Sequence, residues 1–243
     1  MFFSHYASLQ YAYRLVTKLS PWLLAVALLG FVIGLYWALY VAPTDYKQGE
    51  AYRIIYIHVP AAWMSLLTYV MMAVSGFVAV VWRIKVAEVV HTECAPLGAS
   101  FTVITLITGM LWGKPMWGAY WVWDARLTSE LILLFLYLGV IGLGSVISDP
   151  RKSARATALL SIVGLVNIPI IHYSVVWWNT LHQAATVTRF DTPAVHSSML
   201  LPLLFMALVL KVYFVAALCL RMRTAIARRC QDQHWFRREL EIG

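Results

Sequence analysis

Long stretches without a charged side chain alternate with short charged segments along this chain. The uncharged stretches cover residues 21–44, 54–82, 94–113, 131–148, 156–188 and 192–210. A helix that crosses the hydrocarbon core of a bilayer needs about 20 apolar residues. A transmembrane barrel would instead show strands of about ten residues with alternating polarity, and no such alternation occurs here. The pattern therefore predicts six membrane-spanning helices.

We place the six spans at about residues 21–42, 59–82, 93–111, 128–148, 156–176 and 196–220. Residues 1–20 are expected to be an uncleaved lead, because the apolar run after them is long enough to span and no small-residue cleavage pattern follows. No internal repeat or linker rich in Ser and Pro divides the chain. The predicted fold class is all-α: a polytopic membrane protein with one domain over residues 1–243.

The distribution of basic residues predicts the orientation of the helices. The chain has 19 Lys and Arg against 11 Asp and Glu, a net charge of +8. Most of the basic residues fall in residues 14–18, 83–85, 151–155 and 221–238. Cytoplasmic segments carry the excess of Lys and Arg in membrane proteins, so both termini are predicted to be cytoplasmic. Topology accounts for the charge without nucleic acid. We expect the basic tail to bind membrane lipid, with an ATPase subunit as the alternative.

Composition and missing motifs exclude several classes of protein. With 61% hydrophobic and 12% charged residues, the chain is neither an ordinary cytosolic globule nor disordered. Its three cysteines form no C-x-x-C pair, which excludes a thiol oxidoreductase and a c-type cytochrome. Residues 109–114 lack the spacing of a P-loop, so we expect no ATP hydrolysis. We also expect no acidic side chain inside the spans, which disfavours a proton-coupled pump.

Tryptophan is concentrated in the second outer connection. This segment contains Trp112, Trp117, Trp121 and Trp123. Glycine and proline at positions 113, 115 and 118 predict a Trp-rich loop rather than one regular helix. Other tryptophans, among them Trp63, fit an aromatic belt at headgroup depth. The concentrated group fits either membrane anchoring or a platform for a large flat ligand, and composition leaves both open.

Two histidines flank this segment. Pro60 disfavours helix at Val59 and suits a first helical turn, so we expect His58 to point from the membrane edge. His182 follows the fifth span by a few residues. If the two rings meet across the Trp-rich segment, they suit a haem iron, because two neutral imidazoles on opposite faces of a macrocycle make it six-coordinate. A hydrogen-bonded interfacial ring is the alternative for each.

Two further histidines and one acid near this face have simpler interpretations. His172 lies within the fifth span and is expected to make a structural hydrogen bond, with haem ligation as the alternative. His196 is expected to be a solvated residue at the start of the sixth span. Asp124 fits a helix N-cap before Ala125, or a partner for a ligand.

Three basic residues lie closest to the Trp-rich surface, namely Arg53, Lys114 and Arg126. Arginine offers the bidentate geometry that pairs with carboxylates such as haem propionates. Contact with a helix end or a lipid phosphate is equally compatible with each of them.

These residues resemble a known family. Residues 112–130, WGKPMWGAYWVWDARLTSE, resemble the tryptophan-rich WWD domain of haem-handling proteins. IHVPAAW at 57–63 and IHYSVVWWNTLHQ at 171–183 resemble the flanking segments in the CcmC family of system I cytochrome c maturation. The resemblance covers about residues 46–183, and the length and six spans agree. The long Trp motif is its most specific part. Residues 189–196 match no family motif, so His196 receives no role.

The resemblance implies that His58 and His182 are the axial ligands of a haem iron. It implies that the surface for haem and chaperone is formed by Trp112, Trp117, Trp121, Trp123 and Asp124. Haem b would be held transiently and without a covalent bond on the periplasmic side of a bacterial inner membrane. There it would be delivered to the periplasmic haem chaperone CcmE. An ABC-type complex with CcmA, CcmB and CcmD would then release the loaded chaperone using ATP.

The family picture implies a haem-binding and transfer subunit rather than an enzyme, and leaves open whether it assists covalent attachment of haem to the chaperone. One alternative is an integral haem lyase that attaches haem to apocytochrome c, since such proteins share the WWD motif, although they are larger. A membrane b-type cytochrome is the other. It is disfavoured because only His172 lies clearly within a span.

Overall fold

The computed structural model describes residues 8–178, 180–182 and 195–242, and over these ranges the chain is helical and contains no β-strand. The helices are α2 (Leu9–Tyr36), the π-helix η1 (Trp37–Val41), the 3-10 helix η2 (Glu50–Ile54), α3 (Ile55–Trp82), α4 (Lys85–Trp117), α5 (Ala125–Val146), α6 (Pro150–Gly164), α7 (Asn167–Trp177), α8 (Ser197–Cys230) and α9 (His234–Ile242). Six helical segments are long and apolar enough to cross a membrane, namely Leu9–Val41, Glu50–Trp82, Lys85–Trp117, Ala125–Val146, Pro150–Trp177 and Ser197–Cys230. The predicted all-α fold with six spans is confirmed.

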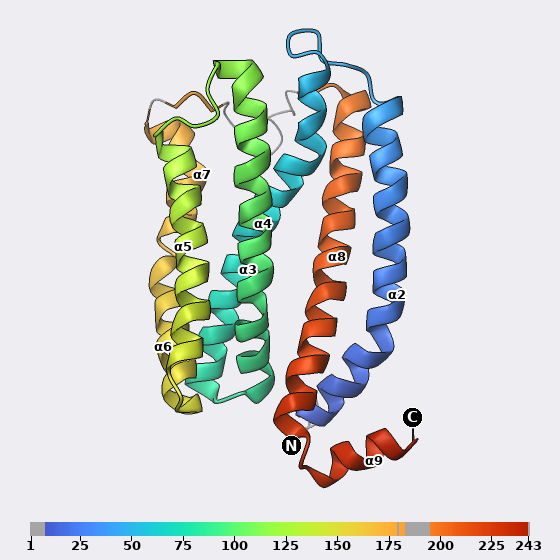
Figure 1. Cartoon of the computed structure of the whole chain (residues 1–243), viewed down its shortest axis with the longest axis vertical. Helices are drawn as coiled ribbons and strands as arrows, with labels where there is room; N and C mark the ends of the chain where they lie inside the picture. Colours follow the sequence, from blue (N-terminus) through green and yellow to red (C-terminus); the bar gives the residue numbers. More distant parts are fainter. Residues whose placement is uncertain (1–7, 179, 183–194, 243) are drawn as a thin grey trace.

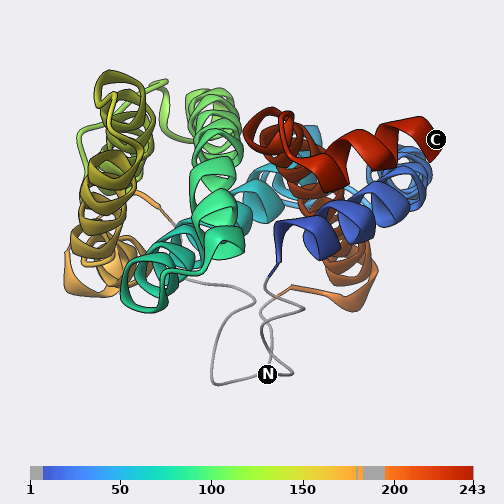
Figure 2. The same ribbon diagram turned by 90° about the horizontal axis from the view of Figure 1, so that it is seen from below.

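The spans run alternately up and down through one bundle (Figure 1). The first turns of α2 and the whole of α9 lie at one end of the bundle, called here the tail end. The connections from η1 to η2 and from α4 to α5 lie at the opposite end, called here the site end. Seen from below, α2 pairs with α8, and α3 and α4 stand between this pair and α5, α6 and α7 (Figure 2). The membrane face on which each end lies stays a prediction.

Two glycines bring α2 close to α8. A Cβ atom on Gly30 would lie 2.9 Å from Cγ2 of Val209, and one on Gly34 would collide with Met206. Small residues four apart let two membrane helices approach at backbone distance. The opposite face of α2 carries exposed apolar side chains such as Trp22, as expected of a helix that borders lipid.

The fifth predicted span consists of two helices, α6 and α7. Pro169 lacks the N–H that would bond to the carbonyl of Leu165, and its ring crowds that carbonyl. The α-helical hydrogen bonds accordingly stop at residues 165–166, where Leu165 donates to Ile162 three residues back. The side chain of Asn167, the first residue of α7, donates to the backbone oxygen of Ser129 in α5 at 2.9 Å. The break therefore lets α7 lean on α5 at the site end.

Helix α4 takes in the first half of the Trp-rich segment and ends at Trp117, so the segment is not one regular helix, as predicted, although the helix extends past the predicted end of the span at residue 111. The helix passes through Gly113 and Pro115 and stops at Gly118, which has φ of 77° and donates to the carbonyl of Lys114 at 3.0 Å. Membrane helices tolerate such residues where neighbouring groups satisfy the freed backbone. Trp112 and Trp117 are consequently held on a rigid helix.

Helix α5 carries an acidic residue inside its span, contrary to expectation. Glu130 is 6% exposed and lies in the second turn of α5, which begins at Ala125. The expectation rested on the uncharged stretch 131–148, whereas the predicted span 128–148 already contained Glu130. An acid inside a membrane helix usually faces the protein interior or a cavity, and Glu130 does so.

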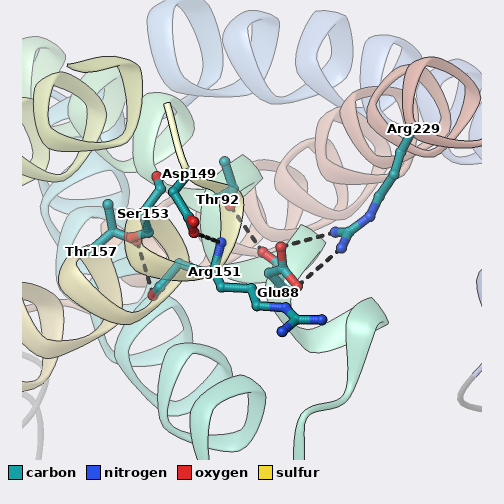
Figure 3. A network of polar contacts seen from close by, with 8 residues as sticks. Glu88, Thr92, Asp149, Arg151, Ser153, Thr157 and Arg229 are labelled. Carbon is teal, nitrogen blue, oxygen red and sulfur yellow. Dashed lines mark hydrogen bonds and ion pairs between the residues drawn. The ribbon is translucent and has the colours of Figure 1, made fainter. Parts of the chain in front are cut away.

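Polar contacts hold the helices together at the tail end (Figure 3). Glu88 of α4 pairs with Arg229 of α8 at 3.0 Å. Asp149 caps α6 by accepting a hydrogen bond from the backbone N–H of Arg151 at 2.9 Å. These contacts are at the end of the bundle opposite to the Trp-rich segment.

Candidate functional site

A cavity opens at the site end between α3, α4, α5 and α7. Its wall includes His58, Ala62, Trp63 and Leu66 of α3, Thr105, Trp112 and Trp117 of α4, Arg126, Leu127 and Glu130 of α5, His172 of α7, and Trp121 and His182 of the connecting segments. Most of this wall is apolar or aromatic, with a few polar groups directed inward. Such a composition is typical of a site for a small organic ligand or cofactor.

His58 lies inside α3 and faces α4 rather than the membrane edge. The 3-10 helix η2 leads directly into α3 at Ile55, so Val59 and Pro60 are helical and the expected irregular start is wrong. Pro60 deprives the helix of its bond to the carbonyl of Tyr56. The His58 ring is 7% exposed. A Cβ atom on Gly109 would lie 3.1 Å from its Cε1 atom, so a glycine in α4 makes room for the ring.

A hydroxyl group in α4 selects the tautomer of His58. Nδ1 of His58 lies 3.0 Å from Oγ1 of Thr108, and that hydroxyl donates its own proton to the carbonyl of Ile104 at 2.6 Å. The hydroxyl must therefore accept a proton from Nδ1–H. In a neutral imidazole this leaves Nε2 with a free lone pair. That is the form in which histidine binds a metal.

His182 lies opposite His58, although far from it in the sequence. The centroids of the two rings are 6.3 Å apart and their planes differ by 32°. The ring of Trp117 approaches His182 at 6.3 Å, and the Thr180 hydroxyl donates to its backbone oxygen at 3.3 Å. The α7 helix ends at Trp177, so His182 is carried by the segment after it, as the sequence predicts.

The tryptophans of the segment occupy different positions around the cavity. Trp112 meets the His58 ring edge-on at 5.7 Å, and its Nε1 donates to Gln48 at 2.9 Å. Trp117 and Trp121 also line the cavity. Trp123 packs edge-on against Trp121 at 5.3 Å but is 75% exposed and outside the wall. Three of these side chains thus enclose the site, while Trp123 faces away from it.

The charged candidates also differ in position. Asp124 is the N-cap of α5 and accepts from the N–H of Leu127 at 2.8 Å, which confirms the capping interpretation. Its other oxygen is buried without a hydrogen-bond partner in the described part of the chain. Arg126 lines the cavity and donates to the carbonyl of Ile171 at 2.7 Å. Arg53 instead donates to the carbonyls that end η1 and pairs with Glu50, away from the cavity wall.

The sequence profile of the CcmC family, described as heme exporter protein C, matches residues 2–237. The chain belongs to this family. Proteins named heme exporter protein C from Haemophilus influenzae, Bradyrhizobium diazoefficiens and Escherichia coli are 44%, 46% and 53% identical to it. The three alignments cover 95%, 88% and 72% of this chain, and 94%, 81% and 71% of those proteins.

In this member of the CcmC family, two other histidines near the site behave differently. His196 caps α8 by accepting from the N–H of Ser198 at 3.3 Å, as its interpretation as a cap-region residue predicts. His172 lines the cavity and meets Tyr173 edge-on at 4.8 Å. Its ring makes no hydrogen bond to the described residues, so the expected structural bond is not found. Asn179, Gln183 and Arg189 of the same segment lie outside the described residues.

Trp63 and Glu130 are among the wall residues that were not candidates from sequence. Trp63, interpreted as a belt residue, lines the cavity instead, and Glu130 lies below it in the wall. Helical spacing carried a signal for Trp63, because residues 55, 58, 59, 62, 63 and 66 share one face of a helix. Glu130 had a similar signal, because it lies four residues after Arg126 and therefore on the same face of α5.

Proposed function

We propose that this chain binds haem b in the cavity at the site end, with His58 and His182 as the two axial ligands, and delivers it to the periplasmic haem chaperone CcmE. The observation that carries the proposal is the facing pair of imidazoles inside an aromatic wall. The names of its relatives, heme exporter protein C, support a role in handling haem for cytochrome c maturation.

The separation of the two rings fits one metal ion between them. A metal–imidazole bond is about 2.0 Å long and the ring centre lies about 1.1 Å beyond the bound nitrogen, so two imidazoles on opposite sides of a metal have centres about 6 Å apart. The centroids of His58 and His182 are 6.3 Å apart. The Nε2 lone pair that Thr108 leaves on His58 supplies a ligand without prior loss of a proton.

The rest of the wall suits a broad, flat and largely apolar molecule. Haem supplies the iron that the imidazoles bind, and its porphyrin is a planar surface. Trp112 and Trp117 contact the two histidine rings and fix their positions. Trp63, Leu66 and the other apolar side chains exclude water from the lower part of the cavity. Arg126 is the cation of this wall and would hold a propionate, whereas Arg53 is engaged elsewhere.

Delivery would begin at the mouth of the cavity. Residues 118–124 join α4 to α5 and carry the exposed rings of Tyr120 and Trp123. Exposed aromatic side chains are common anchors in protein interfaces, so this segment, with Asp124 at its end, is the proposed docking surface for CcmE. We assign this end to the periplasmic side of the inner membrane. The energy of ATP would come from CcmA and CcmB, in a complex that also contains CcmD.

The proposal describes transfer by positioning, not enzyme catalysis by an acid or base of this chain. It is tested by loading the complex with CcmA, CcmB and CcmD in nanodiscs with haem, adding CcmE, and measuring haem in the separated chaperone. Wild type is expected to transfer haem. Trp123→Ala is expected to keep the bound haem spectrum but to transfer about tenfold more slowly.

Trp22→Ala is the matched control, because Trp22 is 74% exposed on α2 and has no place in the proposed docking surface. Equal transfer rates for wild type and Trp123→Ala would contradict the assigned docking surface. No transfer from wild type, together with attachment of haem to apocytochrome c by this chain, would instead show a haem lyase.

A further inference from the structure

Glu130 is a buried carboxylate on the deep side of the cavity. Its side chain is 6% exposed and forms part of the cavity wall. Oε1 of Glu130 accepts a hydrogen bond from Ser65 at 2.8 Å. Ser65 follows His58 by seven residues on α3, which places it about 10 Å further into the bundle. The carboxylate is therefore held about 10 Å below the level of His58.

The charges along α5 are ordered with depth. Arg126 lies one helical turn nearer the site end than Glu130, and both line the cavity. Arg126 is fixed by its bond to the carbonyl of Ile171 at 2.7 Å, and Glu130 is fixed by Ser65. Apolar side chains, including Leu66 and Leu127, complete the wall at this depth. A ligand in the cavity thus meets a guanidinium group nearer the site end and a carboxyl group nearer the cavity floor.

Haem has two unlike edges, since both propionates lie on one side of the ring and the vinyl groups lie on the other side. We propose that Glu130 is a specificity-determining residue that sets the rotational orientation of bound haem, with the propionate edge kept away from the cavity floor. This inference rests on the proposed haem site. Like charges brought together in an interface select against that arrangement.

The size of the expected preference follows from Coulomb's law. At about pH 9, where both carboxyl groups would be ionised, two like charges about 4 Å apart in a medium of intermediate polarity would disfavour the reversed orientation by about 100-fold. The orientations are therefore compared at this pH. Attraction between a propionate and Arg126 acts in the same direction. Wild-type protein is therefore expected to hold haem with one edge inward.

The test uses a symmetric protohaem isomer, so that only exchange of the vinyl and propionate edges creates a second species. The hyperfine-shifted methyl resonances of the ferric complex in nanodiscs count the orientations. Wild type is expected to give one set of resonances. Glu130→Gln keeps the acceptor for Ser65 but removes the charge, and is expected to give two sets with populations within about tenfold of each other.

Two controls separate charge from packing. Ser65→Ala keeps the Glu130 charge and is expected to retain one predominant set. The dimethyl ester of the same haem has no propionate charge, so wild type and Glu130→Gln are expected to give the same mixture with it. A single unchanged orientation in Glu130→Gln, or a single orientation of the ester in wild type, would overturn the proposal.

The optical spectrum distinguishes this result from failure of the haem site itself. Glu130→Gln is expected to keep the six-coordinate low-spin spectrum of wild type, because neither axial ligand changes. Absence of that spectrum in wild type would contradict the proposed function. If Glu130→Gln shows the spectrum and holds haem in the same single orientation as wild type, only the role of Glu130 is contradicted.

Discussion

At the scale of single residues, the hydroxyl of Thr108 orients the ring of His58. Because it donates to Ile104 and accepts from His58, it determines which ring nitrogen faces the cavity. Partners of this kind orient metal-bound histidines, and their loss typically lowers metal affinity by 10–100-fold. Thr108 is four helical turns into the charge-free stretch of α4 and carries no sequence motif. Its role follows only from the packing of α3 against α4.

Replacing Thr108 with Val tests this role. The substitution keeps the shape of the side chain but removes the hydroxyl partner of the His58 ring and leaves its hydrogen bond to the Thr105 backbone, so we expect haem affinity to fall by about tenfold. Haem titration in nanodiscs measures the change. Thr102→Val is the control, because Thr102 is buried in the same helix and bonds only to its own backbone at Gly98. Equal affinity in the two variants would contradict the role of Thr108.

At the scale of elements, sequence periodicity predicted the existence of the spans but not their ends. The uncharged stretches identified all six helical spans, since each must bury about 20 apolar residues in lipid. The stretch up to Gly113 did not reveal that α4 continues to Trp117, because backbone satisfaction at Pro115 depends on neighbours. The break before Asn167 has a signal in the sequence, Pro169, but the contact of Asn167 with Ser129 that places α7 against α5 does not.

The residues of the candidate site were also predicted only in part from the sequence. The order of the His and Trp motifs singled out His58 and His182, and the fold brings their rings together. Trp63 and Glu130 were missed although helical spacing places each on the same face as a candidate residue, His58 and Arg126 respectively; which face turns to the cavity is set by packing. Arg53 was included for its charge, but the end of η1 occupies its guanidinium.

Gly118 ends α4 and begins the proposed docking segment, residues 118–124. Its φ of 77° is in the left-handed region, and no atom lies within 4 Å of a Cβ placed there. Gly118→Ala is therefore expected to cost about 1–2 kcal/mol through backbone strain rather than a clash. The free energy of unfolding in nanodiscs measures this cost. Gly142→Ala in α5, also with open space around it, is expected to show no loss, and an equal loss in both would contradict the strain argument.

At the scale of the whole molecule, both ends of the described chain are joined at the tail end. Phe236 of α9 packs edge-on against Tyr13 of α2 at 5.2 Å, and Glu239 pairs with Arg14. The positive-inside rule predicts that this end faces the cytoplasm, so the cavity is predicted to face the other side of the membrane.

Cysteine labelling tests this orientation directly. The native cysteines Cys94, Cys219 and Cys230 are buried, so they are expected to react slowly with a membrane-impermeant maleimide. Tyr46→Cys introduces a thiol at a residue that is 88% exposed at the site end, and it is expected to react in intact spheroplasts. Asp232→Cys at the tail end is expected to react only after the membrane is opened. The reverse order would place the cavity in the cytoplasm.

The proposed function requires above all that His58 and His182 bind one haem iron together. The direct measurement is the optical and electron paramagnetic resonance spectrum of haem bound to the purified protein, compared among wild type, His58→Ala, His182→Ala and the control His196→Ala. We expect a six-coordinate low-spin spectrum in wild type and in His196→Ala, and its loss in either of the other variants. A variant lacking both His58 and His182 that kept the wild-type spectrum would contradict the account.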